Sequence, residues 1–152
     1  YMMSLGSDGL AQVSGDAVLS ANYLLAKLKD TLSASFEGPC MHEALFDDRF
    51  LEGTGVTTLD FAKALIDQGF HPMTMYFPLV VHGALLIEPT ETESKETLDL
   101  FVKTMTELAA KAKAGDVAFF TEAPKLTPRR RLDETLAARN PVLVWKPDSE
   151  QD

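Results

Sequence analysis

Apolar residues between positions 7 and 29 recur at steps of three and four, the spacing that places side chains on one face of a helix. The pattern therefore predicts a long first helix over residues 7–29. Gly15 lies inside it and costs about 1 kcal/mol relative to alanine, which indicates a bend or a close approach by another element. The apolar stripe consists of Leu10, Val13, Ala17, Val18, Ala21, Leu24, Leu25 and Leu28.

After this helix the pattern changes to short apolar segments separated by turn residues. We predict one strand at residues 34–36 and a second at residues 41–46. Gly38 and Pro39 lie between them, and this dipeptide is typical of a turn.

A second helix is predicted to begin after Thr57. Asp60 follows three residues later, which resembles a capping box in which aspartate replaces the usual glutamate. Gly69 is expected to end the helix, because a left-handed residue is common directly after a helix. The stripe that this helix would bury is Leu59, Ala62, Leu65, Ile66 and Phe70.

The segment from Met73 to Glu88 is apolar, and Pro78 and Gly83 interrupt it. It predicts one or two short strands, of which residues 85–87 form the clearest. Proline cannot donate to a sheet ladder, so we expect Pro78 at a sheet edge or at the start of a strand.

The third helix has the most regular pattern, with apolar residues in step from Leu98 to Ala112. Thr90 and Glu93 have capping-box spacing, and Gly115 follows the last turn. On the exposed face, acid-before-base pairs four residues apart are expected to stabilise the helix slightly. These pairs are Asp99 with Lys103 and Glu107 with Lys111.

Beyond Gly115 four prolines and one short helical stretch at residues 132–138 predict an extended tail that wraps a surface. The order of elements predicts an α+β fold, with a small, mostly antiparallel sheet and helices on one side. We interpret residues 1–152 as a single domain. It would consist of a long helix (1–30), an α+β core (31–115) and the tail (116–152).

Composition narrows the possible functions. The chain has 152 residues, of which 45% are hydrophobic, so it can bury one substantial core. Its formal net charge of -9 argues against nucleic acid as a partner. No apolar run reaches the roughly 20 residues that a membrane-spanning helix needs. The single Cys40 excludes a disulfide within the chain, and no metal-binding motif is present.

Three histidines could carry chemistry. His42 and Glu43 are adjacent and could form a proton-transfer pair, although neighbours on a strand face opposite sides, so only one would point into a given pocket. The alternative is a hydrogen-bonded core histidine and a surface glutamate. His71 precedes Pro72, which favours an extended backbone, and we expect it to cap the last carbonyls of the second helix. His82 has the same ambiguity.

The acidic segment at residues 88–96 also has two interpretations. It could be a loop and a solvated first helical turn, where carboxylates are favourable. Alternatively, backbone N–H groups and the hydroxyls of Thr90 and Thr92 could line the mouth of a polar pocket. The basic cluster at residues 129–131 could bind a carboxylate, but an internal ion pair is the commoner role.

Several stretches together resemble a known family. They are AVLSANYLLAKLKD (17–30), GPCMHE (38–43), the long run from Gly55 to Asp99 that includes GFHPMTMYFPL and IEPTETESKE, TPRRRLDE (127–134) and AARNPVL (137–143). These stretches resemble the C-terminal part of the glycine decarboxylase P-protein of the glycine cleavage system. The similarity is greatest to the second (β) subunit of the two-subunit bacterial type.

This resemblance implies the small C-terminal domain of a fold-type-I enzyme that depends on pyridoxal phosphate. Such an enzyme decarboxylates glycine and passes the aminomethyl group to the lipoyl arm of the H-protein. The resemblance also implies subunit 1 (α) and a large domain as partners. In the family the cofactor lysine lies upstream of this region, and no segment here matches that stretch. We therefore expect no Schiff base on this chain and no activity from it alone.

Six polar residues within the resembling stretches are candidates to line the cleft: His42, Glu43, His71, Thr90, Glu91 and Thr92. The start at Tyr1 within a predicted helix suggests a piece of a longer protein. A bacterial cytoplasmic location follows from the resemblance, or the mitochondrial matrix for a eukaryotic counterpart. The alternative hypothesis is a free-standing α+β binding or regulatory module.

Overall fold

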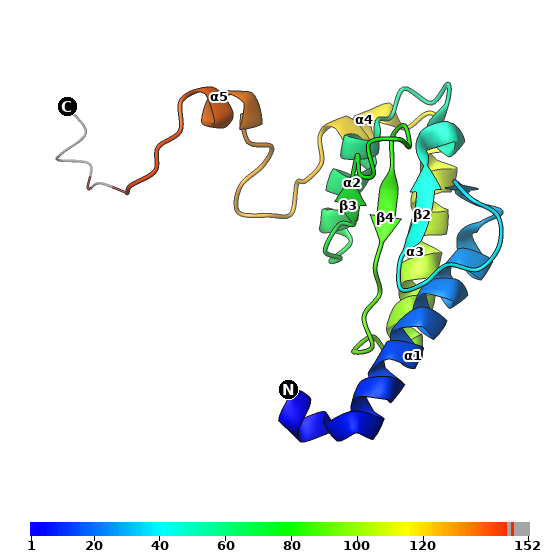
Figure 1. The fold of residues 1–152 in the computed structure, drawn as a ribbon. Helices are drawn as coiled ribbons and strands as arrows, with labels where there is room; N and C mark the ends of the chain where they lie inside the picture. Colours follow the sequence, from blue (N-terminus) through cyan, green and yellow to red (C-terminus); the bar gives the residue numbers. More distant parts are fainter. Residues whose placement is uncertain (146, 148–152) are drawn as a thin grey trace.

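The structure is a computed structural model that describes residues 1–145 and 147, and it has the predicted α+β architecture (Figure 1). Its sheet has four antiparallel strands in the order β1-β2-β4-β3. Their bounds are β1 Ser33–Ala34, β2 Ala44–Asp47, β3 Thr74–Met75 and β4 Leu85–Ile87. The strand predicted at residues 85–87 is confirmed.

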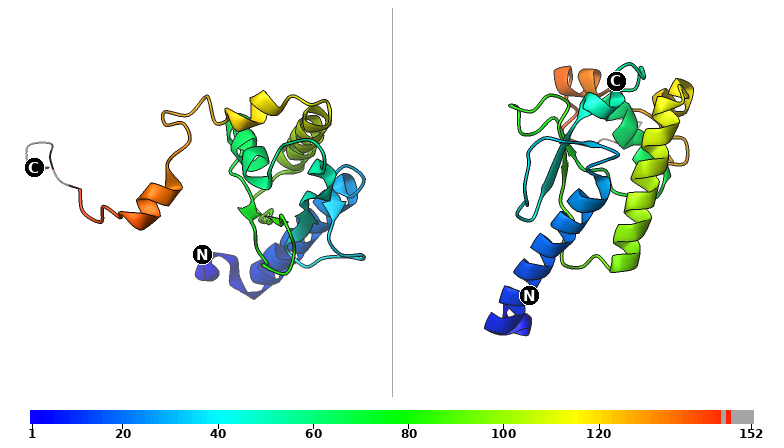
Figure 2. Two further views of the ribbon diagram at one scale, coloured as in Figure 1. Left: turned by 90° about the horizontal axis from the view of Figure 1, so that it is seen from above. Right: turned by 90° about the vertical axis from the view of Figure 1, so that its right-hand side faces the viewer.

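Three helices, α1 (Met2–Leu28), α2 (Thr58–Asp67) and α3 (Lys95–Lys113), cover one face of this sheet (Figures 1 and 2). The burial of the central strands alternates accordingly. Leu85 and Ile87 of β4 are buried, whereas Leu86 between them is only half-buried. The prediction of helices on one side of an antiparallel sheet is therefore confirmed.

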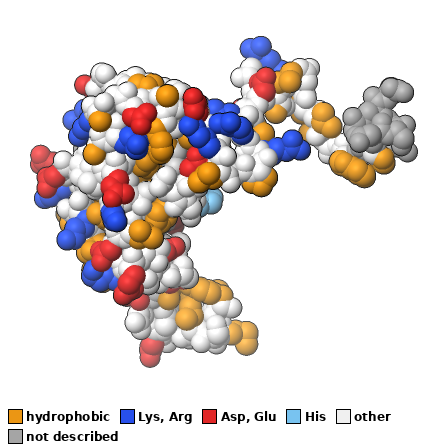
Figure 3. All heavy atoms as spheres, turned by 180° about the vertical axis from the view of Figure 1, so that it is seen from behind, with side chains coloured by type: hydrophobic (Ala, Val, Ile, Leu, Met, Phe, Trp, Pro, Cys, Tyr) orange, Lys and Arg blue, Asp and Glu red, His pale blue; other side chains and the backbone are white. Residues whose placement is uncertain are grey.

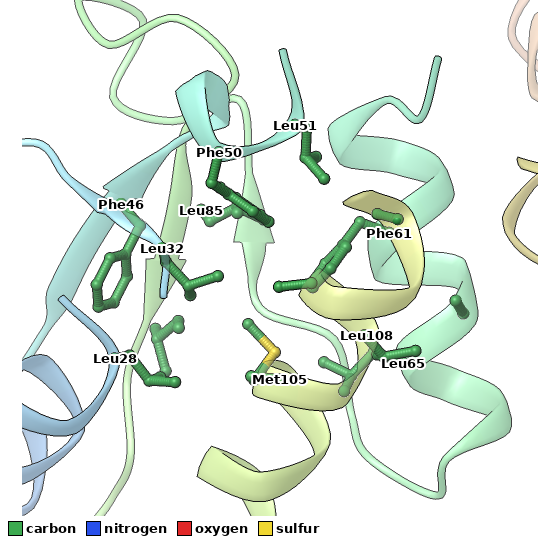
Figure 4. Close-up of a cluster of buried hydrophobic side chains, with 14 of the residues drawn as sticks. Leu28, Leu32, Phe46, Phe50, Leu51, Phe61, Leu65, Leu85, Met105 and Leu108 are labelled. Atoms are coloured by element: carbon green, nitrogen blue, oxygen red, sulfur yellow. The ribbon is translucent and has the colours of Figure 1, made fainter. Parts of the chain in front are cut away.

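The core lies between the sheet and the helices and is rich in aromatic rings (Figure 4). Phe61 of α2 is fully buried at its centre. Its ring meets Phe50 edge-on with centroids 5.3 Å apart and stacks on Phe120 at 6.0 Å. Met105 and Leu108 bring α3 into the same cluster. Apolar burial of this kind is the main force that holds the domain together.

The predicted cap of α2 is confirmed. The Thr57 hydroxyl accepts a hydrogen bond from the Asp60 N–H group, and the Asp60 carboxylate accepts one from the Thr57 N–H group. Gly69 follows the helix at a φ of +84°, the left-handed conformation expected there. Local sequence therefore determines both ends of this helix.

The ends of α1 and α3 differ from the prediction. In α1 the non-helical residue is Gly6, whereas Gly15 is helical and a side chain there would meet nothing within 4 Å. The N-cap of α3 is Ser94, whose hydroxyl accepts from the Thr97 N–H group, so the proposed Thr90 and Glu93 box is wrong. The ion pairs on α3 also differ from those predicted, because each lysine pairs with the acidic residue four positions after it: Lys95 with Asp99 and Lys103 with Glu107.

Three short segments were also predicted wrongly. The first strand is Ser33–Ala34 instead of residues 34–36, because the chain bends from residue 35 onward. Residues 41 and 42 form a bend and Glu43 is not part of a strand, so β2 begins only at Ala44. Pro78 lies in the loop between β3 and β4 and belongs to neither strand. The structure also has two short helices that the sequence pattern did not predict: η1 (Asp48–Leu51, a 3-10 helix) and α4 (Val117–Thr121).

The tail is anchored at its start and then leaves the domain (Figures 1 and 2). The N–H groups of Lys125 and Leu126 donate to the Asp67 carboxylate, and Arg131 forms an ion pair of 2.7 Å with Asp60. The short helix predicted at 132–138 occurs as α5 (Glu134–Arg139).

Beyond α5 the described tail residues do not pack on this domain, so the wrapping of a surface by the tail stays a prediction. Val142, Leu143 and Trp145 are all more than 80% exposed. Figure 3 shows apolar side chains on the tail and at the N-terminal end of α1. Residue 146 and the end of the predicted tail, residues 148–152, lie outside the described residues. Among the residues described, no helix combines the length and the apolar character needed to cross a membrane.

Candidate functional site

A groove of about 350 Å³ lies where α1, the end of β4 and the start of α3 meet the segment after α2. Its apolar lining includes Leu24, Leu86 and Phe101. Its polar lining comes mainly from His71, Glu88, Glu93 and Thr97. An apolar hollow with a few convergent polar groups is the usual form of a small-molecule site.

Strand pairing brings a cluster of titratable groups together beside this groove. Ala44, the first residue of β2, pairs with Ile87, the last residue of β4. Glu43, just before β2, therefore lies next to Glu88, just after β4. One polar atom each from His42, Glu43 and Glu88 lies within 4.8 Å of the others, and His42 Nε2 is 4.0 Å from Glu43 Oε1. We refer to these three residues as the acidic cluster.

The conformation of residues 41–43 corrects the expectation for His42 and Glu43. Because none of these residues is in a strand, their side chains do not have to alternate between two faces. Both side chains therefore reach Glu88. Asn22 of α1 holds the bend through two hydrogen bonds to Cys40: its Nδ2 donates to the Cys40 carbonyl at 2.7 Å, and its Oδ1 accepts from the Cys40 N–H group at 3.0 Å.

The acidic cluster combines one imidazole with two carboxylates. The His42 and Glu43 side chains are 54% and 37% exposed, so water reaches both groups. Such a set can exchange protons or hold an ammonium group or another cation by charge-assisted hydrogen bonds. The same exposure means that a ligand must exclude water before these charges bind it strongly.

His71 lies in the groove lining and does not cap α2 as expected. Its Nδ1 is 2.8 Å from the Pro72 carbonyl oxygen, which can only accept, so Nδ1 carries the proton in this contact. When the ring is neutral, this tautomer leaves Nε2 as a hydrogen-bond acceptor. Backbone groups end α2 instead, with the Gly69 N–H group donating to the Ile66 carbonyl at 2.9 Å.

Thr90, Glu91 and Thr92 form a turn before α3 instead of its first residues. The hydroxyls of Thr90 and Thr92 are 2.6 Å apart, and both residues are exposed. The Glu91 carboxylate accepts a hydrogen bond from the Tyr1 hydroxyl at 2.7 Å. This hydrogen bond lowers the pKa of Glu91 and raises the pKa of Tyr1. The three residues thus follow Glu88 in the segment that joins β4 to α3.

Sequence reasoning missed Glu88 as the residue that links the acidic cluster to the groove. Its position directly after the clearest strand was the available signal, but only the β2–β4 pairing shows which residue it meets. His82 lies elsewhere, with its Nδ1 at 3.0 Å from Asp48 Oδ1, and this hydrogen bond raises the pKa of His82. Arg131 is occupied internally by Asp60 and by the carbonyls of Phe120 and Ala123.

The fold and the candidate site define a small α+β domain with a polar-edged groove. The family described as "Glycine dehydrogenase, C-terminal domain" matches residues 13–123. The chain belongs to this family.

Similar proteins agree on the particular subunit. The chain is 70% identical over 148 residues to a probable glycine dehydrogenase (decarboxylating) subunit 2 of Caulobacter vibrioides, covering 97% of this chain and 28% of that protein. Proteins with the same name from Caldanaerobacter subterraneus and Exiguobacterium sibiricum are 52% and 48% identical. The matches cover 95% and 99% of this chain and 30% of each relative. The chain therefore spans about 30% of the length of the relatives that it matches.

Proposed function

We propose that this chain acts as the C-terminal domain of the decarboxylating subunit 2 (β) of the glycine cleavage P-protein. The observation that carries the proposal is the 70% identity to a glycine dehydrogenase subunit 2 over 97% of the chain. The same identity favours an enzyme component over the free-standing binding or regulatory module. The complete enzyme would take glycine as substrate and transfer its aminomethyl group to the lipoyl arm of the H-protein. The proposed location is the bacterial cytoplasm.

The lysines among the described residues do not fit covalent binding of pyridoxal phosphate in this groove. A Schiff-base lysine must reach a ligand pocket, and no described lysine lines the groove. Lys95 is paired with Asp99, and Lys63 donates to Glu134 at 3.3 Å. The proposal therefore assigns the cofactor lysine to the remaining part of the subunit, and we expect no activity from residues 1–152 alone.

The role left to this domain is that of a fold-type-I small domain, which forms one wall of a cleft completed by the large domain and by subunit 1 (α). We propose that His42, Glu43, His71, Thr90, Glu91 and Thr92 line this wall, together with Glu88. The acidic cluster would hold or exchange protons at the cleft edge. The Nε2 atom of His71 would accept a hydrogen bond within it. Closure by the other domain would exclude water and so strengthen these contacts.

The test is glycine–bicarbonate exchange by the complete enzyme. We expect the His42→Ala and Thr90→Ala variants to slow the exchange while the far-UV circular dichroism stays unchanged. Thr106→Ala is the matched control, because Thr106 is exposed on α3 and donates only to the Val102 carbonyl of its own helix. If both site variants exchange at the wild-type rate, His42 and Thr90 have only a structural role.

A further inference from the structure

The loop between β3 and β4 presents bulky apolar side chains to solvent. Phe77 is 57% exposed, and Leu79 and Val80 are each 89% exposed. In the right-hand view of Figure 2 this loop projects from the upper end of the sheet, on the side opposite α3. Residues 76–82 carry no carboxylate, lysine or arginine, and His82 is their only titratable side chain apart from the Tyr76 phenol. We call this segment the 76–82 loop.

The start of the 76–82 loop is fixed to the body of the domain. The Tyr76 hydroxyl accepts a hydrogen bond from the Leu59 N–H group, in the first turn of α2, at 3.2 Å. The Tyr76 N–H group donates to the Ala84 carbonyl at 2.9 Å. Tyr76 has a φ of +57°, a left-handed conformation that a bulky residue adopts only where its surroundings impose it.

The end of the loop is fixed just as firmly. The buried Thr58 hydroxyl donates to the Gly83 carbonyl at 3.0 Å. His82 Nδ1 contacts Asp48 Oδ1 at 3.0 Å. Asp48 also packs so closely on Gly83 that a Cβ atom added there would lie 2.0 Å from Asp48 Cγ. Both ends are thus held while the apolar tip stays uncovered by the described residues.

A fixed loop with an apolar tip suits a permanent protein contact. Because its ends are already ordered, binding restricts little further backbone freedom. The lack of charge at the tip is typical of the core of an obligate interface and unlike the polar rim of a transient one. The remaining question is which surface covers it.

We propose that the 76–82 loop docks into an apolar depression on the remaining part of the same subunit-2 polypeptide. This inference rests on the proposed function. The relatives extend well beyond this chain, which covers only 28 to 30% of the three compared here. Over two thirds of such a polypeptide lies outside residues 1–152. A body in the same chain meets the loop at an effective concentration set by the linker, in the millimolar range for a short one, which favours it over subunit 1 or a second copy.

Amide hydrogen exchange in the complete subunit 2, purified without subunit 1, tests the proposal. Within the described residues the N–H groups of Leu79 and Val80 donate no hydrogen bond, so uncovered they should exchange near the intrinsic rate. Docking is expected to slow both at least about tenfold. Exchange at the intrinsic rate overturns the proposal. Slowing that requires subunit 1, or that disappears on dilution, overturns it in favour of subunit 1 or of a second copy.

A pair of variants of the complete subunit supplies the second measurement. Leu79→Asp is expected to lower the thermal midpoint of the complete subunit, because it places a charge in the docked contact. Leu100→Asp is the control, since Leu100 is 54% exposed on α3, away from the loop. Equal midpoints for the two variants contradict the proposal. Neither measurement requires enzymatic activity, so a protected loop together with a complete two-subunit enzyme that fails to exchange glycine and bicarbonate would refute only the proposed function.

Discussion

Replacing Gly83 with alanine is expected to destabilise the domain more than the same change at any glycine that has open space around it. Gly83 has a φ of +58°, and an added Cβ atom would lie 2.0 Å from Asp48 Cγ and 2.5 Å from Asp48 Cβ. A new rotamer of Asp48 can move its carboxylate but not its Cβ atom. The backbone must therefore shift, or the contact between His82 and Asp48 must break.

The magnitude separates into two contributions. A left-handed alanine costs about 1–2 kcal/mol, and overpacking a close contact adds roughly 1–3 kcal/mol. Gly83→Ala should therefore lower the free energy of unfolding by about 2–5 kcal/mol. Gly69→Ala is the matched control, because Gly69 has a φ of +84° and nothing within 4 Å of an added Cβ. It should cost only about 1–2 kcal/mol.

Urea denaturation of the chain, followed by far-UV circular dichroism, measures these differences. The decisive comparison repeats Gly83→Ala in an Asp48→Gly background, where the obstructing side chain is gone. There the cost should fall to the value for Gly69→Ala, which gives a coupling energy of roughly 1–3 kcal/mol between the two sites. Equal costs for Gly83→Ala with and without the Asp48 side chain would refute the close contact.

Three further outcomes follow from the structure. Phe61→Ala should lower the free energy of unfolding by about 3–5 kcal/mol and Phe61→Leu by much less, as urea titration would show; a small effect of the alanine variant would contradict its central packing. The hydrogen bond to Asp48 raises the pKa of His82, so NMR titration should give His82 a higher pKa in the wild type than in Asp48→Asn. The stability from this contact is fully present below the unfolded pKa of about 6.5 and is lost as pH rises through the folded pKa. Burial alone would raise the pKa of Asp60, but hydrogen bonds from Thr57 and Arg131 outweigh it and lower the pKa. The stability from Asp60 is therefore present above the unfolded pKa of about 3.9 and lost as pH falls through the folded pKa, so Asp60→Asn should show a weaker loss of stability in acid than the wild type.

The features that could be predicted from the sequence are those set by neighbours in the chain. The α2 helix is the clearest case, because Thr57 and Asp60 cap its start and Gly69 supplies the left-handed residue at its end. The strand at 85–87 follows from its apolar side chains alone. Both depend on contacts within a few residues, which a pattern contains.

The errors arose where local patterns allow two solutions. On α3, basic and acidic residues alternate at every fourth position from Lys95 to Lys111. Each charged residue between these two therefore has a possible ion-pair partner on both sides. Spacing cannot choose between these registers. The α4 helix has only five residues, fewer than a periodic pattern needs. Two caps also compete before α3, and the turn in which the Glu93 N–H group donates to the Thr90 carbonyl leaves Ser94 as the actual cap.

The candidate site could be predicted only in part. His42, Glu43 and His71 are residue types that suit chemistry, and the structure places them around one end of the sheet. The meeting of His42 and Glu43 with Glu88 depends on the pairing of β2 with β4, which joins Ala44 to Ile87, more than forty positions away. No local pattern contains that information. The same holds for the two hydrogen bonds by which Asn22 fixes the bend before His42.

The exposed tail determines what optical measurements on this protein can report. Trp145, the only tryptophan of the sequence, is 82% exposed, and the tail beyond α5 that carries it extends away from the rest of the domain (Figure 1). Its emission should therefore be that of a solvated indole and should hardly change when the core unfolds. Any shift of that emission to shorter wavelength would instead report capture of the tail by another surface, which gives the protein a built-in fluorescent probe of assembly.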